Sequence, residues 1–573
     1  MYAKARAGYT CEAMSPRFRN TLAAVLGALA ASAFAQACFT TGGGGEDAAK
    51  PGGAACDCPP LKGTDAALPG EEKPLRGGTL RIAITSEPGT LLSMYSTDAT
   101  VRQIADHEVL EALTVIDPAS GEPLPELAAR WENTAGSGVY TFHLVRDAKW
   151  HDGVPFSAAD VVFTFDQLLD PAGGAALRSE FLDVREVVAA DAATVTVRLD
   201  RDRPDLPAAL SRVPILPAHV FGKETVATHP AARAPIGTGP FRFAAWKRGV
   251  QIELERNPDF RGVAPYLERI VYRQAPERRA AIDLYRSREI DVVPRVGSAR
   301  LGTELLAGGR TVAYPLESFV GIVYNTAIPL FADAATRRAI GLLLDREAIR
   351  CSVLRCVAEI ALDPWPRSGA GVSRESAPQS FDPPAARRLL EAAGWRDENG
   401  DGVRERRGER LSFRLLVPDT DRDARRWVTL FEEDLEAAGV SARVDAVGWG
   451  VYTDRLRAHR FDAAILTTSN ARPFDPGALF RGGAEESGRN FGAFKEPRID
   501  AVLDALAGTP SPASRGALED RLTALLAETQ PMTFAFRPGE VMLVRSAVHG
   551  VRIRDEGLDE RAVWLDRTEG GAP

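Results

Sequence analysis

The feature that most constrains the fold of this chain is a block in its first third that joins an unusual turn to the start of a helix. Lys149–Gly153 reads Lys-Trp-His-Asp-Gly, and Pro155–Phe163 follows it directly. Just before the block, Tyr140, Phe142 and Leu144 fall on alternate positions, as a half-buried strand requires. The block therefore predicts a strand, a turn and a helix in a fixed order.

A second region alternates strand and helix. Apolar residues alternate from Leu411 to Leu415, recur at helical spacing from Val428 to Leu435, and alternate again from Val440 to Ala446. Gly439 stands where the C-cap of the helix is expected. This pattern predicts a β-α-β unit with parallel strands and a right-handed crossover.

Length and charge limit the class of protein. A chain of 573 residues is too long for one hydrophobic core, so two or three domains are expected. The formal net charge is -8, and no Lys/Arg-rich tract is present, so we expect no nucleic-acid partner. No period typical of repeat arrays is found, which argues against a solenoid.

The N-terminus predicts export. Arg17 and Arg19 precede an apolar run, Leu22–Ala35, that ends in small residues, which is the layout of a secretory signal. The run is too short to span a bilayer comfortably. Met1 and Met14 are alternative starts, since the residues between them add nothing that such a signal needs. We therefore expect a periplasmic or otherwise extracytoplasmic protein.

Two features after the signal bear on membrane attachment. Cleavage after Ala37 would place Cys38 at the new N-terminus, where a lipid would tether the protein. The usual lipoprotein pattern has Leu where Ala35 stands and a small residue where Gln36 stands, so an unmodified Cys38 is the alternative. From Phe39 to Lys73 the chain is rich in Gly, Ala, Pro and Thr, which predicts a flexible leash.

Two cysteines lie in the body of the chain. An exported protein permits disulfides, and we expect a bridge between Cys351 and Cys356 at a helix end. Two free buried thiols are the alternative. Zinc binding is the least expected outcome, because no matching pair of Cys or His residues completes four ligands.

Other motifs predict no metal site, cofactor or enzymatic activity. Asp397–Gly402 imitates the start of an EF-hand loop, but Gly408 replaces the bidentate Glu at the last loop position, so a turn is predicted. His151 beside Asp152 lacks a nucleophile motif such as G-x-S-x-G. The seven His residues are scattered, without metal-ligand spacing.

The order of several segments resembles the large peptide-type solute-binding proteins of bacterial ABC importers (family 5). The resemblance runs from about Gly77 to the C-terminal region. The matching segments are Gly77–Ala83, Glu87–Leu91, Lys149–Phe163, Gly237–Phe241, Arg256–Phe260, Glu289–Val292, Arg337–Ile340, Asp345–Ile349 and Asn490–Gly492.

The resemblance implies an α/β, two-lobed periplasmic-binding-protein fold (type II-like, cluster C) with an extra domain in the first lobe. The expected parts are a signal peptide (1–37), a linker (38–75), a first lobe of two subdomains (76–318), a second lobe (319–530) and a return to the first lobe (531–573). It also implies a monomer that captures a peptide-like solute between its lobes and delivers it to an ABC permease, without a cofactor.

Two places are expected to touch the ligand because of the resemblance. Ser93, Met94 and Tyr95 follow the loop after the first strand, where relatives approach the ligand; a surface loop is the alternative. Trp449 follows the strand that ends near Val447, and related peptide binders place an aromatic residue there; a core position is the alternative.

The segment that contains Thr468, Ser469, Asn470 and Arg472 departs from the family pattern. Peptide-binding relatives carry a Trp and then an Asp that pairs with the free α-amine of the peptide. Here Thr468 stands near the Trp position and Ala471 or Arg472 near the Asp position. Arg472 would repel an amine and bind an anion, unless it faces solvent.

This departure keeps other ligands open. Peptide comes first, and an oligosaccharide, a metal chelate or an anionic metabolite is the alternative. A ligand-sensing receptor subunit would share the same residues, whereas a hydrolase would need a nucleophile or paired acids that the motifs do not supply.

Overall fold

The computed structural model describes a mixed α/β chain. The residues described are 58, 61, 73–117, 121–134, 136–222, 224–297, 306, 308–366, 380–470, 474–483, 489–509, 512–554 and 557–566. Helices alternate with strands over most of this length, so the predicted α/β class is confirmed. Within this part of the chain, no helix is both long enough and apolar enough to cross a membrane.

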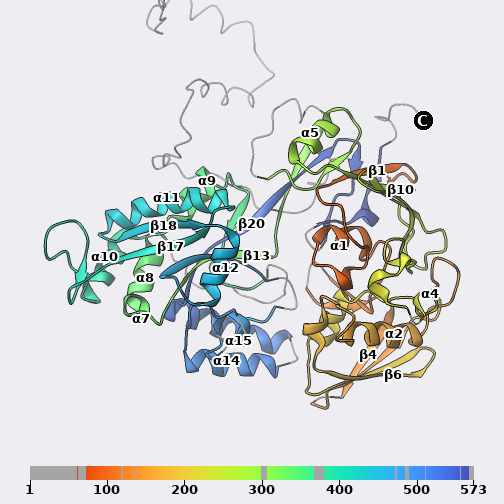
Figure 1. Ribbon diagram of the computed structural model, residues 1–573, viewed down its shortest axis with the longest axis horizontal. Helices are drawn as coiled ribbons and strands as arrows, with labels where there is room; N and C mark the ends of the chain where they lie inside the picture. The colour runs from red at the N-terminus through yellow and green to blue at the C-terminus, as the bar shows by residue number, and fades with distance from the viewer. Residues whose placement is uncertain are drawn as a thin grey trace, which may run out of the picture. The chain divides into compact units, whose positions relative to one another are not determined.

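A twelve-stranded sheet forms the framework (Figure 1). The strand order is β18-β17-β19-β13-β20-β11-β1-β10-β9-β8, and β12 and β14 both pair with β20 outside this path. The strands are β1 (Thr79–Ile84), β8 (Phe241–Lys247), β9 (Gln251–Arg256), β10 (Arg269–Gln274), β11 (Val292–Val293), β12 (Gly309–Pro315), β13 (Ser318–Tyr324), β14 (Ala358–Ile360), β17 (Ser412–Pro418), β18 (Ser441–Val447), β19 (Ala463–Ser469) and β20 (Met532–Arg545).

Strand β20 belongs to both lobes of the protein. Its first part pairs with β13 and β14, and its second part pairs with β12 and β11. The change of partner falls between Pro538, opposite Ala358, and Gly539, opposite Pro315. A proline lacks the N–H that a central strand needs, so it fits where the pairing changes. We call Pro315–Glu317 together with Pro538 and Gly539 the junction.

Each lobe has its own hydrophobic core. The first lobe packs β1, β10 and the second part of β20 together with an antiparallel sheet of order β4-β5-β7-β6. The second lobe buries apolar side chains on both faces of its part of the large sheet. The four-stranded sheet is the extra domain expected in the first lobe; its elements are β4 (Ala128–Thr134), β5 (Val139–Leu144), β6 (Val184–Asp191), β7 (Thr194–Leu199) and α2 (Ala158–Leu169).

Helices cover both lobes. They include η1 (Ser93–Tyr95), α1 (Ala99–Ala105), α5 (Arg278–Arg286) and η6 (Glu560–Ala562) in the first lobe, and α8 (Ala334–Leu342), α9 (Arg346–Ser352), α10 (Pro383–Ala392), α11 (Arg422–Ala437), α12 (Trp449–Arg457), α14 (Pro497–Ala507) and α15 (Pro512–Thr529) in the second.

The turn and helix start at Lys149–Phe163 have a structural role. The backbone N–H of Gly237 donates to Nδ1 of His151 (3.1 Å), and Nε2 of the same ring contacts the carbonyl of Gly239 (3.1 Å). Burial lowers the pKa of His151 to about 4, so the ring is neutral at pH 7. Ser157 and Asp160 form a capping box that starts α2. The turn therefore ties the extra domain to the Gly-rich segment after it.

The predicted β-α-β unit is confirmed. β17 and β18 are parallel, with Ser412 opposite Ser441 and Pro418 opposite Val447, and α11 connects them. Gly439 has a φ of 82° just past the end of the helix, which is the left-handed conformation expected of a glycine at this position.

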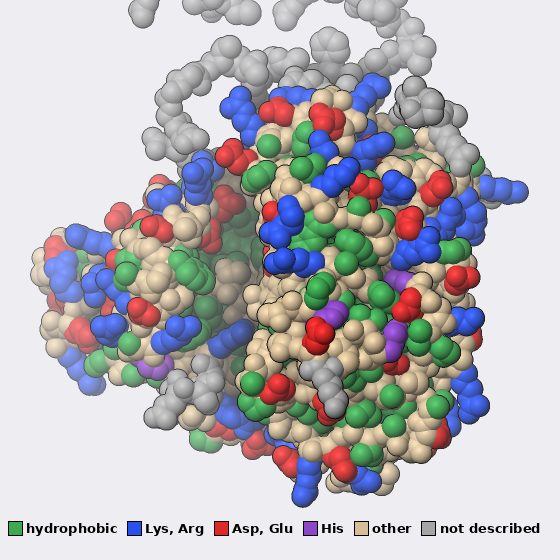
Figure 2. Space-filling view, turned by 45° about the vertical axis from the view of Figure 1, so that its right-hand side comes forward, with side chains coloured by type: hydrophobic (Ala, Val, Ile, Leu, Met, Phe, Trp, Pro, Cys, Tyr) green, Lys and Arg blue, Asp and Glu red, His purple; other side chains and the backbone are tan. Residues whose placement is uncertain are grey.

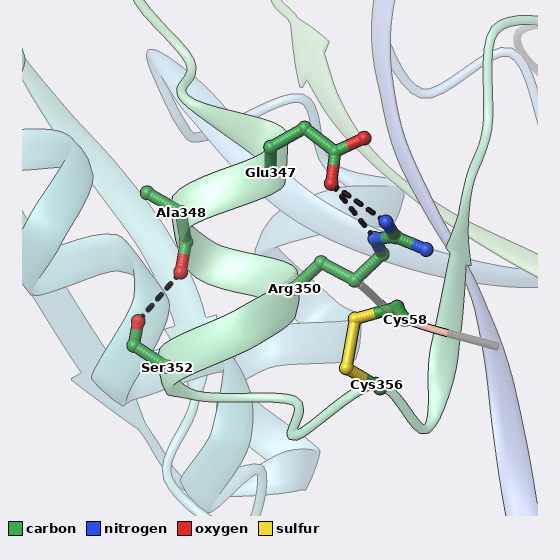
Figure 3. Close-up of a disulfide and its surroundings, with 6 residues drawn as sticks. All are labelled: Cys58, Glu347, Ala348, Arg350, Ser352 and Cys356. Atoms are coloured by element: carbon green, nitrogen blue, oxygen red, sulfur yellow. Dashed lines mark hydrogen bonds and ion pairs between the residues drawn. A yellow bond between two sulfur atoms is a disulfide. The ribbon is translucent and has the colours of Figure 1, made fainter. Parts of the chain in front are cut away.

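The predicted bridge between Cys351 and Cys356 is wrong. Cys356 pairs with Cys58, with a Cα–Cα distance of 5.2 Å (Figure 3). After α9, the N–H of Cys356 donates to the carbonyl of Arg350 (2.9 Å) and Cys356 adopts a φ of 62°. This tight turn presents Cys356 to the N-terminal segment. Cys351 is disulfide-bonded too, so the alternative of two free thiols is also wrong.

The loop that imitates an EF-hand is a turn, as predicted. The two carboxylate oxygens of Asp397 accept from the backbone N–H groups of Gly400 (2.8 Å) and Gly402 (3.1 Å). Arg410 donates to Asp401 (2.6 Å) and occupies a carboxylate that a cation would need. Among the residues that the structure describes, no group of three His, Cys, Asp or Glu side chains could hold a metal ion.

Candidate functional site

Three parallel strands of the second lobe end at one edge. β17 is parallel to β18 on one side and to β19 on the other, with Leu415 opposite Ala463. In open α/β sheets, ligands bind outside the carboxyl ends of the strands. The residues that follow these ends are Asp419, Gly448–Trp449 and Asn470. The sheet therefore brings Trp449 and the Thr468–Asn470 segment, which lie apart in the sequence, to the same edge.

Trp449 presents an aromatic surface at this edge. It is the first residue of α12 and its side chain is 61% exposed, so the alternative of a core position does not hold for it. Its ring stacks on the ring of Tyr452 (centroids 5.5 Å apart, 25° between planes). The Tyr452 hydroxyl donates to the carbonyl of Ile465 (2.5 Å), and burial raises the pKa of this phenol. Tyr452 thereby fixes the exposed ring to β19.

The Thr468–Asn470 segment alternates between burial and exposure. Thr468 is buried, whereas Ser469 is exposed and donates through its hydroxyl to the carbonyl of Glu317 (3.2 Å). The backbone N–H of Asn470 donates to that same carbonyl (3.0 Å). The edge is therefore joined directly to the junction through Glu317.

Asn470 carries a buried oxygen that lacks a partner. The side chain is 1% exposed, and its Nδ2 donates to the carbonyl of Pro364 (2.9 Å), which fixes the direction of the amide. The other amide atom, Oδ1, has no hydrogen-bond partner among the residues that the structure describes. A buried acceptor without a donor costs about 1–3 kcal/mol. An N–H group of a ligand would remove this cost.

A cluster that the sequence reasoning missed supports Asn470 from behind. Arg537 pairs with Asp363 (2.5 Å), and both side chains are buried. The backbone N–H of Trp365 donates to Asp363 (3.0 Å), and its indole N–H donates to Thr523 (2.8 Å). The Trp365 ring meets Phe474 edge-on (6.1 Å). The sequence signal that was overlooked is the run Asp363–Pro366, in which an acidic residue precedes a Trp between two prolines.

The first-lobe loop offers less accessible surface than expected. Ser93 is buried and donates to Asp106 (2.6 Å), while Met94 is fully buried in the core. Met94 is therefore placed to support the loop rather than to touch a ligand. Tyr95 is partly exposed; burial, with a smaller effect of the Asp170 charge, raises its pKa to about 12. Of the three predicted residues, Tyr95 is the one with an accessible ring.

Two predicted residues, Arg472 and Cys38, lie outside the described residues. On the face that Figure 2 shows, acidic and basic side chains are interspersed rather than gathered by sign. Such a face lacks the continuous basic stripe expected of a nucleic-acid interface.

Comparisons with known proteins agree with this geometry. A family model described as bacterial extracellular solute-binding proteins, family 5 (middle region), matches residues 122–490. The oligopeptide-binding protein AppA of Bacillus subtilis (strain 168) is 27% identical over 489 residues, which cover 84% of this chain and 90% of the relative.

Solved structures extend the likeness to the fold. The structure of AppA from Bacillus subtilis in complex with a nonapeptide aligns with a TM-score of 0.67 at 26% identity, covering 86% of this chain and all (100%) of that one. The structure of HbpA2 from Haemophilus parasuis aligns with a TM-score of 0.75 at 20% identity, covering 85% and 100%. The two-lobed fold expected from the sequence is confirmed.

Proposed function

Because this chain belongs to the bacterial extracellular solute-binding proteins, family 5, we propose that it is the substrate-binding component of an ABC importer for a peptide-like solute. The observation that carries the proposal is the end-to-end likeness to an oligopeptide-binding relative, over 84% of this chain and 90% of that protein. The protein captures the solute outside the cytoplasm and delivers it to a membrane permease. A ligand drives this cycle only by its preference for one conformation over the other.

The ligand surface is the carboxyl edge of β17, β18 and β19. The Trp449 ring packs against an apolar side chain of the solute. The Oδ1 atom of Asn470, which is buried in this structure, accepts an N–H from the solute when binding exposes the amide. Thr468 and Ser469 directly precede Asn470 at the end of β19, and Tyr95 contributes an aromatic ring from the first lobe. A peptide suits this combination, because each of its units carries an N–H donor and a side chain.

Arg472 is proposed to decide which end of the ligand is accepted. Relatives that grip a free α-amine use an Asp near this position, and a buried ammonium without a carboxylate would cost several kcal/mol, on the order of 3–5. A guanidinium instead favours a carboxylate or another anion. We therefore expect the solute to carry a blocked amine or an acidic group near Arg472.

Attachment to a membrane is proposed through Cys38. Signal cleavage before this residue and lipid addition would leave the protein on a leash at the outer surface of the membrane, close to its permease. Without the lipid, the same protein would act as a freely diffusing periplasmic component.

The test is to denature the purified, exported protein and to identify the released small molecules by mass spectrometry, with a metal assay on the same sample. Recovered peptides support the proposal, and their N-termini report on Arg472. A sugar, a metal chelate or an anionic metabolite as the sole ligand would contradict the peptide assignment while leaving the transport role intact. If nothing is released, titration calorimetry with a defined oligopeptide mixture decides.

A further inference from the structure

A leucine from the N-terminal segment fills a space that a glycine leaves at the junction. Leu61 is only 4% exposed, although it lies in the stretch that composition predicts to be a flexible leash. A Cβ atom placed on Gly539 would lie 2.5 Å from Cδ1 of Leu61. The same point is 2.9 Å from the carbonyl oxygen of Tyr314 and 3.1 Å from that of Val357. Gly539 therefore provides the room in which Leu61 sits.

The two carbonyls beside Gly539 belong to different lobes. Tyr314 lies on β12, which joins the first lobe, while Val357 directly precedes β14 of the second. The N–H of Gly539 donates to Val357 (3.0 Å), and the N–H of Leu316 donates to Pro538 (2.9 Å). The bond from Leu316 holds the two chain segments of the junction together, and the bond from Gly539 ties the junction to the second lobe. Leu61 packs over the place where the two segments cross from one lobe to the other.

A disulfide holds Leu61 in position. Cys58, three residues before it, is bonded to Cys356, at the turn between α9 and β14 (Figure 3). Three residues can span at most roughly 10 Å, so the bond keeps the leucine beside the junction. The turn itself is fixed by the hydrogen bond from Cys356 to Arg350 (2.9 Å). Arg350 in turn pairs with Glu347 one turn earlier on α9 (2.8 Å).

We propose that Cys58 and Leu61 together act as a strap that stiffens the junction: the bond from Cys58 to Cys356 seats Leu61 against Gly539, and the seated side chain restrains bending between the lobes. A change in the angle between two lobes requires changes of φ and ψ in the few residues that connect them. Here those residues are covered by a side chain that must move with them. The strap thus sets how readily the lobes rearrange, whatever the ligand is.

Hydrogen exchange of the exported full-length protein, followed by mass spectrometry, tests the strap without a ligand. The variants are Leu61→Ala, which keeps the disulfide, and the double variant Cys58→Ser/Cys356→Ser, which removes it without leaving a free thiol. Leu75→Ala is the matched control, since Leu75 is 40% exposed in the same N-terminal region. Peptides that contain Leu316 and Gly539 report on the junction, and peptides from β5 report on the extra domain.

Both strap variants should exchange about tenfold faster at the junction peptides, with β5 unchanged, and Leu75→Ala should match the wild type. Wild-type exchange at the junction in Leu61→Ala overturns the proposal, even if loss of the disulfide lowers the melting temperature, because the bond would then act only on the unfolded chain. Equal acceleration of every peptide also overturns it. Should the double variant fail to fold, Leu61→Ala alone decides.

Discussion

Tyr272 donates a hydrogen bond to Glu560 (3.1 Å) across a sequence separation of 288 residues. The contact fixes η6, close to the C-terminus, against β10 in the core of the first lobe. Burial, followed by repulsion from Glu108, raises the pKa of the Glu560 carboxyl well above 4.5. The C-terminal return is therefore held by an acid that the fold prefers to keep protonated.

Replacement of this acid by an amide should stabilise the protein at neutral and alkaline pH. A raised folded-state pKa means that the contribution of Glu560 is fully present below about 4.5 and is lost as the pH rises through the folded pKa. Glu560→Gln keeps the shape and carries no proton to lose, so its free energy of unfolding should exceed that of wild type by about 1–3 kcal/mol at pH 8. Thermal melts from pH 4 to 9 measure the difference, with Glu268→Gln at the surface as control. A constant gap over this range would refute the assignment.

Removal of one partner of the Asp363–Arg537 pair should be costly. Both side chains are nearly inaccessible, so Asp363→Ala leaves a guanidinium without its counter-charge and should lower the free energy of unfolding by about 3–5 kcal/mol. Glu528→Ala, which removes one of the two carboxylate partners of the exposed Arg498, should change the free energy of unfolding little. Urea unfolding curves of the two variants give the comparison. If the two variants lost the same small amount of unfolding free energy, the buried pair would contribute no more to stability than an exposed one.

A methyl group at Gly237 should not be tolerated. Its Cβ would lie 1.7 Å from the backbone oxygen of Val109, and a main-chain atom cannot move aside cheaply. We expect Gly237→Ala to lose about 3 kcal/mol or more of stability. Gly89→Ala, where nothing lies within 4 Å of the new carbon, is the matched control and should behave as wild type. Differential scanning fluorimetry gives the melting temperatures of both variants. A wild-type melting temperature for Gly237→Ala would contradict the close contact with Val109.

Trp449→Ala should separate binding from stability. Because the side chain is 61% exposed, the change in the free energy of unfolding should stay within about 0.5 kcal/mol. Affinity for peptides recovered from the protein should fall about tenfold or more, as loss of an aromatic contact implies. Calorimetric titration gives the affinities of the wild type and of Trp449→Ala. Val451→Ala, at another exposed position of α12, is the control for a change on the helix surface. Unchanged affinity would remove Trp449 from the ligand surface.

What could be predicted from the sequence was mostly local. The alternation from Leu411 to Leu415 and the helical spacing after it predict β17 and α11, because burial of one face imposes a period on neighbouring residues. The capping box at Ser157 is likewise carried by residues three apart. Such patterns need no knowledge of the rest of the chain.

The contacts that could not be predicted from the sequence are long-range. Nothing near Cys356 indicates that its partner is 298 residues away, and the nearer Cys351 was the natural choice. The resemblance implies that Met94 approaches the ligand, whereas its side chain is buried in the core of the first lobe. The support of Asn470 by Pro364 depends on a backbone carbonyl, which no residue type reveals.

The shared strand β20 has a consequence for the order of biosynthesis. Ribosomes and export machinery deliver this strand after nearly all the others, yet β13 and β12 each need it as a neighbour. Until Met532–Arg545 arrives, both strands present an open edge that other polypeptides can pair with. A nascent chain stalled before this point is thus prone to aggregate through these two edges. It needs protection by chaperones until β20 completes the sheet.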